Sequence, residues 1–486
     1  NLKIAKEAAL ALKDDPEFLA KVAVYSRDKG YMKDMPAFLV TLLSEIDSKL
    51  FRKVFPLVIN NGKMLRNFCM MARSGAVTGK IRNLSSGTVR NALQGWFDVR
   101  SPYALLKASV GNDPSMKDML RMCKPRPNSD EKAALFGYLM GKKVVDVVIN
   151  RKEQVAFGAL PKIVQEFETF KKNTNGPVPN VDFRLIDSLI NDAQWADVAR
   201  NAQYQMTRMN INTFERHGVF KNAEVTQIIA DRLRNKELLA EARQFPYQLY
   251  STWKATEGTA GVPFIVRDAL QDAMESAIDN VPEFKGQIHV CVDCSGSMSS
   301  AITGSGYGHT SVIRCADVAG LIASSIVRKN RSAKIWTFSD SAREVTLNPR
   351  DTVITNTQKL AQAGGGTNIS APLKKLNEMK ASGDAIIYVS DNESWIDSGS
   401  RFGYGGRTGL ATEWELFKKR NSKARLVCID LTPGTTSQVK ARQDNLQVGG
   451  FSDQVFEVVA SFLEHGNSGN HWVDMIEQVD LDAKKE

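Results

Sequence analysis

The chain has 486 residues, of which 43% are hydrophobic and 24% charged, and it carries a formal net charge of +10. The length predicts two or three domains, and the composition is that of a globular protein without the run of 18 apolar residues that a membrane span needs. Six cysteines without a disulfide pattern indicate a reducing environment, so we expect a cytoplasmic protein.

Residues 1 to about 280 are predicted to form consecutive helices. Apolar residues recur at spacings of three and four through segments such as KIAKEAALALK and MPAFLVTLLSEI, and short turns separate these segments. Asp15 followed by Pro16 is a typical helix start. Short helices with short connections favour antiparallel pairs stacked in series, so we expect an all-α helical-repeat domain over residues 1–280.

The positive charge is concentrated within this helical region. Residues 49–126 hold 15 Lys and Arg against 3 Asp and Glu, which is a net +12 and leaves −2 for the rest of the chain. A surface so rich in cations predicts a polyanionic partner, and nucleic acid is favoured over the alternative of a solvated helical face.

Seven basic residues of this segment are candidates for phosphate contacts. Lys117, Arg121 and Lys124 stand at i, i+4 and i+7 of the SMKDMLRMCK segment, which places them on one face of a helix. Each cation taken singly could be a solvated surface charge, so the cluster is the stronger argument. The complete set of predicted RNA-binding residues is Arg82, Arg90, Lys107, Lys117, Arg121, Lys124 and Arg126.

After Gly286 the pattern changes to short β-branched runs that alternate with helical segments. The runs QIHVCVD, AKIWTFS, AIIYVSD and ARLVCIDL are apolar on both faces. Strands alternating with helices predict a parallel sheet covered on both sides, which is a doubly wound α/β domain over residues 285–486. Ligands of such sheets bind outside the carboxyl ends of the strands.

Oxygen-bearing side chains stand at the ends of these strands. The first strand ends in D-x-S-x-S with Asp293, Ser295 and Ser297, the loop GGGTN supplies Thr367, and a later strand ends in Asp391. Two carboxylates and three hydroxyls are hard ligands that suit octahedral Mg²⁺ or Mn²⁺. The alternative is that these oxygens only cap turns.

This oxygen set resembles the metal-ion-dependent adhesion site of von Willebrand factor A domains. The resemblance implies that the three hydroxyls bind the metal, that the two carboxylates bind it directly or through water, and that an acidic oxygen of a ligand completes the sphere. Asn368 stands where many relatives carry Asp, which removes no primary ligand. Two loops rich in Gly and Ser, residues 299–311 and 397–409, flank the site and could gate it.

The helical part is similar to the TROVE module of the Ro RNA-binding autoantigen family. The order of a TROVE module and then a von Willebrand A domain is itself specific to that family, so the chain is identified as a member of it, of bacterial or phage type. The matching stretches are VYSRDKGYMKDMPAFLV (24–40), TVRNALQGWF (88–97), MKDMLRMCKPRP (116–127), MTRMNINTFERHGVF (206–220) and ARQFPYQLYSTWKA (242–255).

The resemblance implies a ring of HEAT-like helical repeats closed by the A domain. Ro proteins bind small noncoding Y RNAs, admit single-stranded 3′ ends of misfolded RNAs, and in bacteria can work with an exoribonuclease. We therefore expect a non-enzymatic scaffold in RNA quality control or degradation. Two alternatives are a metal-dependent nuclease or phosphotransferase, since metals assist phosphoryl chemistry, and a protein-binding A-domain adhesion factor whose RNA affinity shows no salt dependence.

Overall fold

The computed structural model describes the chain in twelve stretches, and it divides into two compact units. By packing, residues 1–194 and 472–486 form the first unit and residues 195–471 the second. The predicted domain limits at residues 280 and 285 lie within the second unit and stay a prediction. None of the described helices is long and apolar enough to cross a membrane. The described residues are 7, 10–30, 32–85, 87–242, 244, 246–278, 281–302, 313–391, 409–433, 442–451, 454–466 and 469–482.

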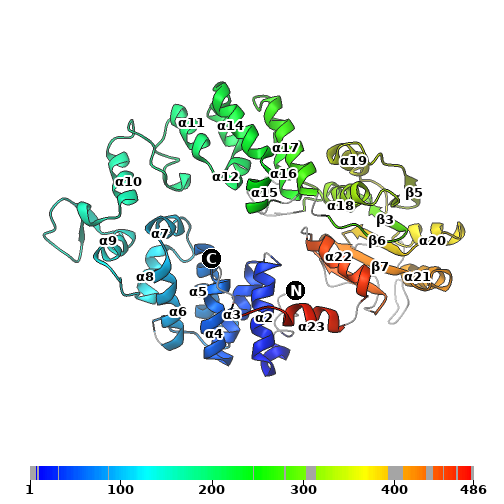
Figure 1. The fold of residues 1–486 in the computed structure, drawn as a ribbon, viewed down its shortest axis with the longest axis horizontal. Coiled ribbons are helices and arrows are strands. Elements are labelled where there is room, and N and C mark those ends of the chain that lie inside the picture. The colour runs from blue at the N-terminus through cyan, green and yellow to red at the C-terminus, as the bar shows by residue number, and fades with distance from the viewer. Residues whose placement is uncertain are drawn as a thin grey trace. The chain divides into compact units, whose positions relative to one another are not determined.

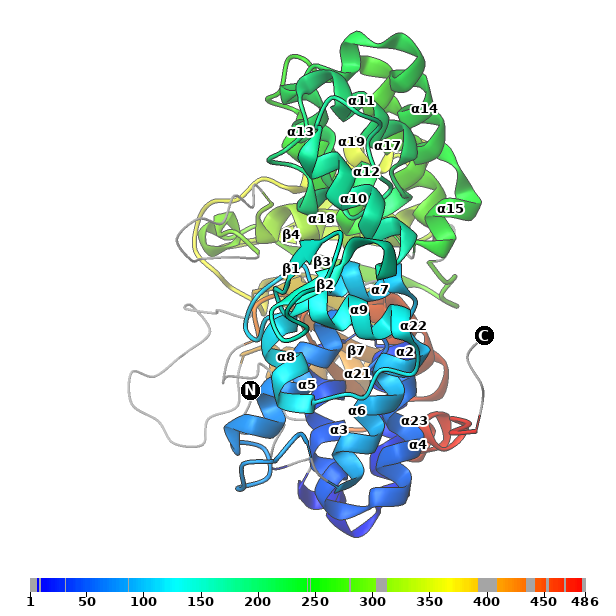
Figure 2. The same ribbon diagram turned by 90° about the vertical axis from the view of Figure 1, so that its left-hand side faces the viewer.

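The first unit consists mainly of short helices, as predicted. Helices α2 to α6 lie side by side (Figures 1 and 2), and α3 packs against α2, α4 and α5. The predicted helix start is confirmed, because the Asp15 carboxylate accepts the N–H of Phe18 and Pro16 holds the first helical position. The helices are α2 (Pro16–Asp28), α3 (Asp34–Ile46), α4 (Ser48–Val58), α5 (Gly62–Ser74), α6 (Gly87–Val99), α7 (Pro102–Ala108), α8 (Met116–Cys123), α9 (Asp130–Leu139) and α10 (Lys162–Lys172), with the short 3-10 helices η1 (Leu12–Asp14), η2 (Phe157–Ala159) and η3 (Phe183–Leu185).

Two features of the first unit lie outside the helical prediction. Strands β1 (Lys143–Val145) and β2 (Gln154–Ala156) form a small parallel pair, and three residues are too few for a strand periodicity to be recognised in the sequence. The end of the chain also belongs to this unit, because Glu477 pairs with Lys21 of α2 and Asp482 with Lys53 of α4.

The second unit begins with another group of helices. Helix α17 packs against both α14 and α16, which lie beside it in Figure 1. The first of these helices, α11, starts three residues before the boundary between the units. The helices are α11 (Asp192–Asn201), α12 (Tyr204–Met209), α13 (Ile211–Arg216), α14 (Ala223–Arg234), α15 (Lys236–Glu241), α16 (Pro246–Thr256) and α17 (Phe264–Ala277), with η4 (Val219–Lys221) before α14.

The rest of the second unit is an α/β domain built on a six-stranded sheet. Its strand order is β5-β4-β3-β6-β7-β8, and all neighbours are parallel except β5, which runs antiparallel to β4. The predicted α/β class is confirmed, and the antiparallel edge strand makes the sheet mixed. The strands are β3 (Ile288–Asp293), β4 (Lys334–Phe338), β5 (Ala342–Val345), β6 (Ala385–Ser390), β7 (Arg425–Asp430) and β8 (Asn445–Gly449).

Helices cover both faces of this sheet, which is why its central strands are apolar throughout. One face forms a core with α20 and α21 that includes Trp336, Tyr388, Trp414 and Phe417. On the other face α18 contacts β3 and β6. The helices of the domain are η6 (Gly296–Ser299), α18 (Cys315–Lys329), α19 (Val353–Leu360), α20 (Ala371–Glu378), α21 (Gly409–Arg420) and α22 (Gln454–His465), and α23 (Gly469–Glu477) leads into the first unit.

Candidate metal centre and nucleic-acid interface

The candidate metal centre lies where the central strands β3 and β6 end. These strands are parallel neighbours, and their register pairs Val292 with Val389, so Asp293 and Asp391 follow at the same edge of the sheet. Both aspartates are buried, and Asp293 is fully inaccessible to solvent. Parallel pairing therefore brings together two carboxylates that are 98 positions apart in the sequence (391 against 293).

The D-x-S-x-S segment turns its oxygens toward one another. Asp293 Oδ1 accepts the N–H of Ser295 at 2.8 Å, and Asp293 Oδ2 accepts the hydroxyl of Ser390 at 2.6 Å. The hydroxyl oxygens of Ser295 and Ser297 lie 3.1 Å apart. Neighbouring ligands of an octahedral ion with metal–oxygen distances of about 2.1 Å are separated by about 3.0 Å, so this spacing fits two ligands of one Mg²⁺.

The carboxylates of Asp293 and Asp391 are buried close together, so it is electrostatically unfavourable for both to be ionised. Burial, helped by the negative charge of nearby Asp391, raises the pKa of Asp293 to about 6 in spite of the hydrogen bonds from Ser295 and Ser390. A cation held between the carboxylates would offset both effects. The observed electrostatics and the oxygen donors therefore fit a divalent cation.

The loop that carries Thr367 is fixed against the D-x-S-x-S segment by two backbone hydrogen bonds. The N–H of Gly364 donates to the carbonyl of Cys294 at 2.8 Å, and the N–H of Gly296 donates to the carbonyl of Gly365 at 3.1 Å. Thr367 itself is 3% exposed. The loop position thus agrees with a shared site, while ligation of a metal by these five residues stays a prediction.

A carboxylate that the sequence did not single out shapes the same loop. Asp340 follows β4, and its Oδ2 accepts the N–H of Gly366 at 3.1 Å. Gly365 has a φ of 82°, and a Cβ at this position would come within 2.7 Å of that oxygen. The second glycine of GGGT is therefore required both by the backbone conformation and by the close approach of Asp340.

The hydroxyl ligands are essential to the predicted site. Within the part of the chain that the structure describes, no group of three or more His, Cys, Asp or Glu side chains could hold a metal. Of the two flanking loops, residues 303–312 and 397–408 lie outside the described residues, so the predicted gating is untested.

Helix α8 carries the central part of the candidate nucleic-acid interface. Lys117, Arg121 and Lys124 are exposed, and none of them forms an ion pair with a described residue. The helix begins with a capping box in which Ser115 and Asp118 bond reciprocally, and it ends at Cys123, with Lys124 as the C-cap residue at a φ of 47°. Lys117 and Arg121 thus share one face of α8, whereas Lys124 follows the helix as its C-cap residue. These three cations, called the α8 row below, remain a predicted RNA contact.

Two more candidates are connected to this row through α6. Both the N–H and the carbonyl of Arg126 bond to the side chain of Gln94, at 2.7 Å each. Arg90 precedes Gln94 by one helical turn. The turn after α8 is therefore held beside the part of α6 that carries Arg90.

The remaining two candidates occupy different surroundings. Arg82 pairs with Glu45 and donates to the carbonyl of Ser44, so much of its charge is already neutralised. The ammonium of Lys107 lies 5.9 Å from the centroid of the Tyr103 ring. Within the described chain no hydrogen bond or ion pair joins either residue to the α8 row, and their contact with RNA stays a prediction.

One cation of the basic segment is structural. Arg66 is 7% exposed, and its guanidinium donates to the carbonyls of Ala108, Val110 and Pro114. These carbonyls lie at and beyond the end of α7, where they lack helical partners. The net charge of the segment therefore overstates the charge available to a ligand, which the sequence alone could not reveal.

Comparisons with known proteins agree with the observed fold. Residues 287–463 match the family model described as the Ro60 vWA domain. The chain is similar in structure to the Ro (RSR) protein of Deinococcus radiodurans, with a TM-score of 0.66 and 17% identity over 95% of this chain and 93% of that one. No curated protein matches the sequence. The chain is thus similar to the Ro60 A domain over residues 287–463 and shares the fold of a Ro protein along most of its length.

Proposed function

We propose that this protein is a non-catalytic RNA-binding scaffold whose α8 row holds RNA phosphates. The observation that carries the proposal is the row itself: Lys117 and Arg121 on one face of α8 and Lys124 at its C-cap are exposed, without an ion-pair partner among the described residues. Unpaired cations retain their attraction for phosphate, and neutralised phosphates supply most of the affinity that does not depend on RNA sequence.

The proposed RNA partners are small structured noncoding RNAs of the Y type and single-stranded 3′ ends of misfolded RNAs. The match to the Ro60 A domain and the fold shared with a Ro protein support this choice. The helical backbone that carries the cations favours the structured RNAs in particular. Their phosphates already have fixed positions, so less conformational entropy is lost on binding. An exoribonuclease is the proposed protein partner, and the proposed role is RNA quality control or degradation.

The A-domain site is proposed to hold Mg²⁺ or Mn²⁺ and to dock an acidic ligand. Ser295, Ser297 and Thr367 would offer hydroxyl oxygens, and Asp293 and Asp391 would bind directly or through water. The bound ion would supply a positive docking point for a carboxylate. The 3.1 Å spacing of the two serine hydroxyls and the convergence of two buried carboxylates support this assignment.

Filter binding of a labelled hairpin RNA over a series of salt concentrations tests the RNA-binding proposal. We expect log K to fall linearly with log salt, with a slope of about −0.9 per phosphate contacted. A protein-binding adhesion factor would instead show no salt-sensitive RNA affinity, and that result would overturn the proposal.

Incubating the purified protein with end-labelled RNA and Mg²⁺ distinguishes the nuclease alternative from the proposed scaffold. A scaffold leaves the RNA intact. Reproducible cleavage that is lost in the Asp293→Ala variant would assign metal-dependent phosphoryl chemistry to the site instead.

A further inference from the structure

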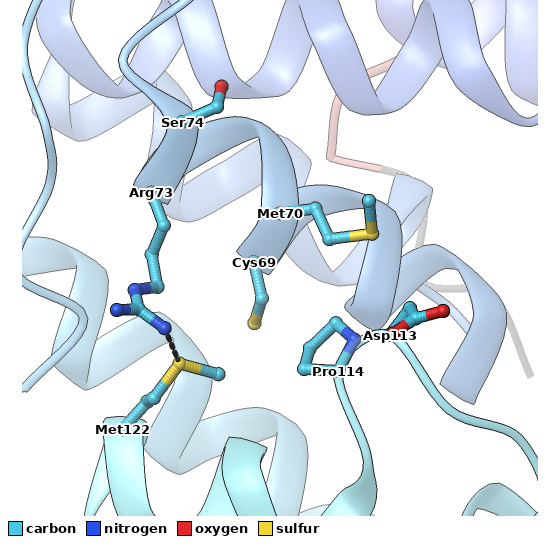
Figure 3. A pocket seen from close by; sticks show the side chains of 7 residues that line it. All are labelled: Cys69, Met70, Arg73, Ser74, Asp113, Pro114 and Met122. Atoms are coloured by element: carbon cyan, nitrogen blue, oxygen red, sulfur yellow. Dashed lines mark hydrogen bonds between the residues drawn. The ribbon is translucent and has the colours of Figure 1, made fainter.

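A pocket of about 430 Å³ lies between α5 and α8 in the first unit (Figure 3). Helix α5 contributes Met70 and Arg73, α8 contributes Met122, and the segment before α8 contributes Asp113 and Pro114. Sites that bind small organic groups have volumes of about 300 to 1,000 Å³, so this pocket is large enough for one such group.

The walls of the pocket are apolar and polarizable. Met70 and Met122 present thioethers from the two helices, Pro114 adds its ring, and the Cys69 thiol points toward the space between Met122 and Pro114 (Figure 3). Met70 is 50% exposed, so its thioether is accessible to a ligand. Thioethers make favourable contacts with aromatic rings, so the interior suits a flat aromatic group.

Two side chains of opposite charge, Arg73 and Asp113, border these walls and attract different parts of a ligand. Arg73 Nη1 donates to the Met122 sulfur at 2.7 Å, a weak neutral acceptor, and Arg73 has no carboxylate partner in the described chain. Asp113 lies on the Pro114 side of the pocket (Figure 3). Its carboxylate repels a phosphate from the interior but can accept hydrogen bonds from amino groups. The pocket therefore favours a base over a phosphate.

The position of the pocket on α8 indicates where such a base would come from. Met122 directly follows Arg121, the middle residue of the cationic row, and Arg73 adds a further exposed cation on α5. A nucleic acid whose phosphates lie on this row would carry its bases past the opening of the pocket. Free aromatic metabolites would not need the neighbouring cations.

We propose that the pocket between α5 and α8 binds a single unpaired base of the RNA whose backbone lies on Lys117, Arg121 and Lys124. This inference rests on the proposed RNA-binding function of the row. Met70 and Met122 stack against the base, Asp113 accepts its amino and imino hydrogens, and Arg73 contacts the adjoining phosphate. Guanine suits the pocket best, because its N1–H and amino group can both donate to one carboxylate.

The test compares two labelled hairpin RNAs, one with a single bulged guanosine and one fully paired. We expect the intact protein to bind the bulged hairpin about five- to 160-fold tighter, which is the contribution of one stacked base. In the double variant Met70→Ala/Met122→Ala this preference should disappear, while affinity for the paired hairpin remains, since no charge is removed. The matched control Met32→Ala/Met209→Ala removes two other exposed methionines and should keep the preference.

A second measurement does not depend on the folding of any variant. A bulged 6-thioguanosine is irradiated in the complex with the wild-type protein, and the attached peptides are mapped after trypsin digestion. Crosslinks are expected in the tryptic peptides 67–73 or 122–132, since the prolines after Lys124 and Arg126 block cleavage there. Crosslinks confined to other segments would refute the pocket assignment.

The outcomes separate the pocket from the function on which it depends. If both hairpins bind in a salt-dependent manner but the bulge preference is absent, or survives in the double variant, the pocket assignment is wrong and the α8 row stands. If neither hairpin binds the wild-type protein, the proposed RNA-binding function fails and the pocket inference fails with it.

Discussion

Neutralising the α8 row tests the proposed RNA interface most directly. The triple variant Lys117→Gln/Arg121→Gln/Lys124→Gln removes three charges and keeps long side chains of good helix propensity. The three side chains are exposed and without ion-pair partners among the described residues, so their removal breaks no ion pair of the fold. Lys117 and Arg121 are about 6 Å apart along α8 at 1.5 Å per residue, and Lys124 directly follows the helix, so one RNA backbone can contact all three.

The expected loss follows from the number of phosphates released. Three contacts change the slope of log K against log salt by roughly 2.1 for single-stranded and 2.7 for duplex RNA, if the coefficients for DNA apply. If the charges contribute nothing at 1 M salt, the affinity at 0.15 M falls by roughly 50- to 160-fold, or about 2.3 to 3.0 kcal/mol.

Filter binding with a hairpin RNA at several salt concentrations measures both quantities. The matched control Lys374→Gln/Lys419→Gln/Lys423→Gln removes three exposed cations of the A domain, so both variants lower the net charge from +10 to +7. Only the α8 variant should change the slope. Equal losses in the two variants would show that the protein's overall charge, and not this helix face, attracts RNA, and the reasoning would be refuted.

Three further predictions concern the metal site, the A-domain core and the predicted RNA contact of Arg82. Mg²⁺ at 100 times its Kd should stabilise the wild-type A domain by about 2.7 kcal/mol, or roughly 5 to 10 °C in Tm, and Asp293→Ala should abolish the shift; equal shifts in both proteins would exclude the site. Trp336 Nε1 donates to His289 Nδ1 at 3.1 Å, and burial lowers the pKa of His289, so this imidazole is neutral when folded. Protonation of His289 therefore favours the unfolded chain. As pH drops below about 6.5, the free energy of unfolding should fall by up to about 1.4 kcal/mol per pH unit because of this residue. Urea unfolding at several pH values should show a weaker pH dependence in His289→Gln. Arg82→Gln should reduce the free energy of unfolding by about 1 kcal/mol through loss of its bonds to Glu45 and Ser44, yet leave RNA affinity within about threefold, against about fivefold for Arg121→Gln in the same filter assay.

Much of the fold could be predicted because its signals are local. Apolar spacing indicated the helices of the first 280 residues, and alternating strands and helices indicated the α/β domain. The edge strand β5 (Ala342–Val345) was not predicted, because its four residues are at most half-buried and lack an apolar run. Strands β1 and β2 were not predicted, because each has only three residues.

For the candidate sites, the sequence by itself determined which donors stand at strand ends and which cations share a helix face, since both follow from fixed repeats along the chain. Only the tertiary structure decided which of them have partners. Arg66 is engaged by carbonyls of the α7–α8 connection, Arg82 by Glu45, and Asp340 by the glycine loop. The pocket between α5 and α8 likewise depends on residues about 50 positions apart. Such contacts arise from packing between distant segments, and no local periodicity encodes them.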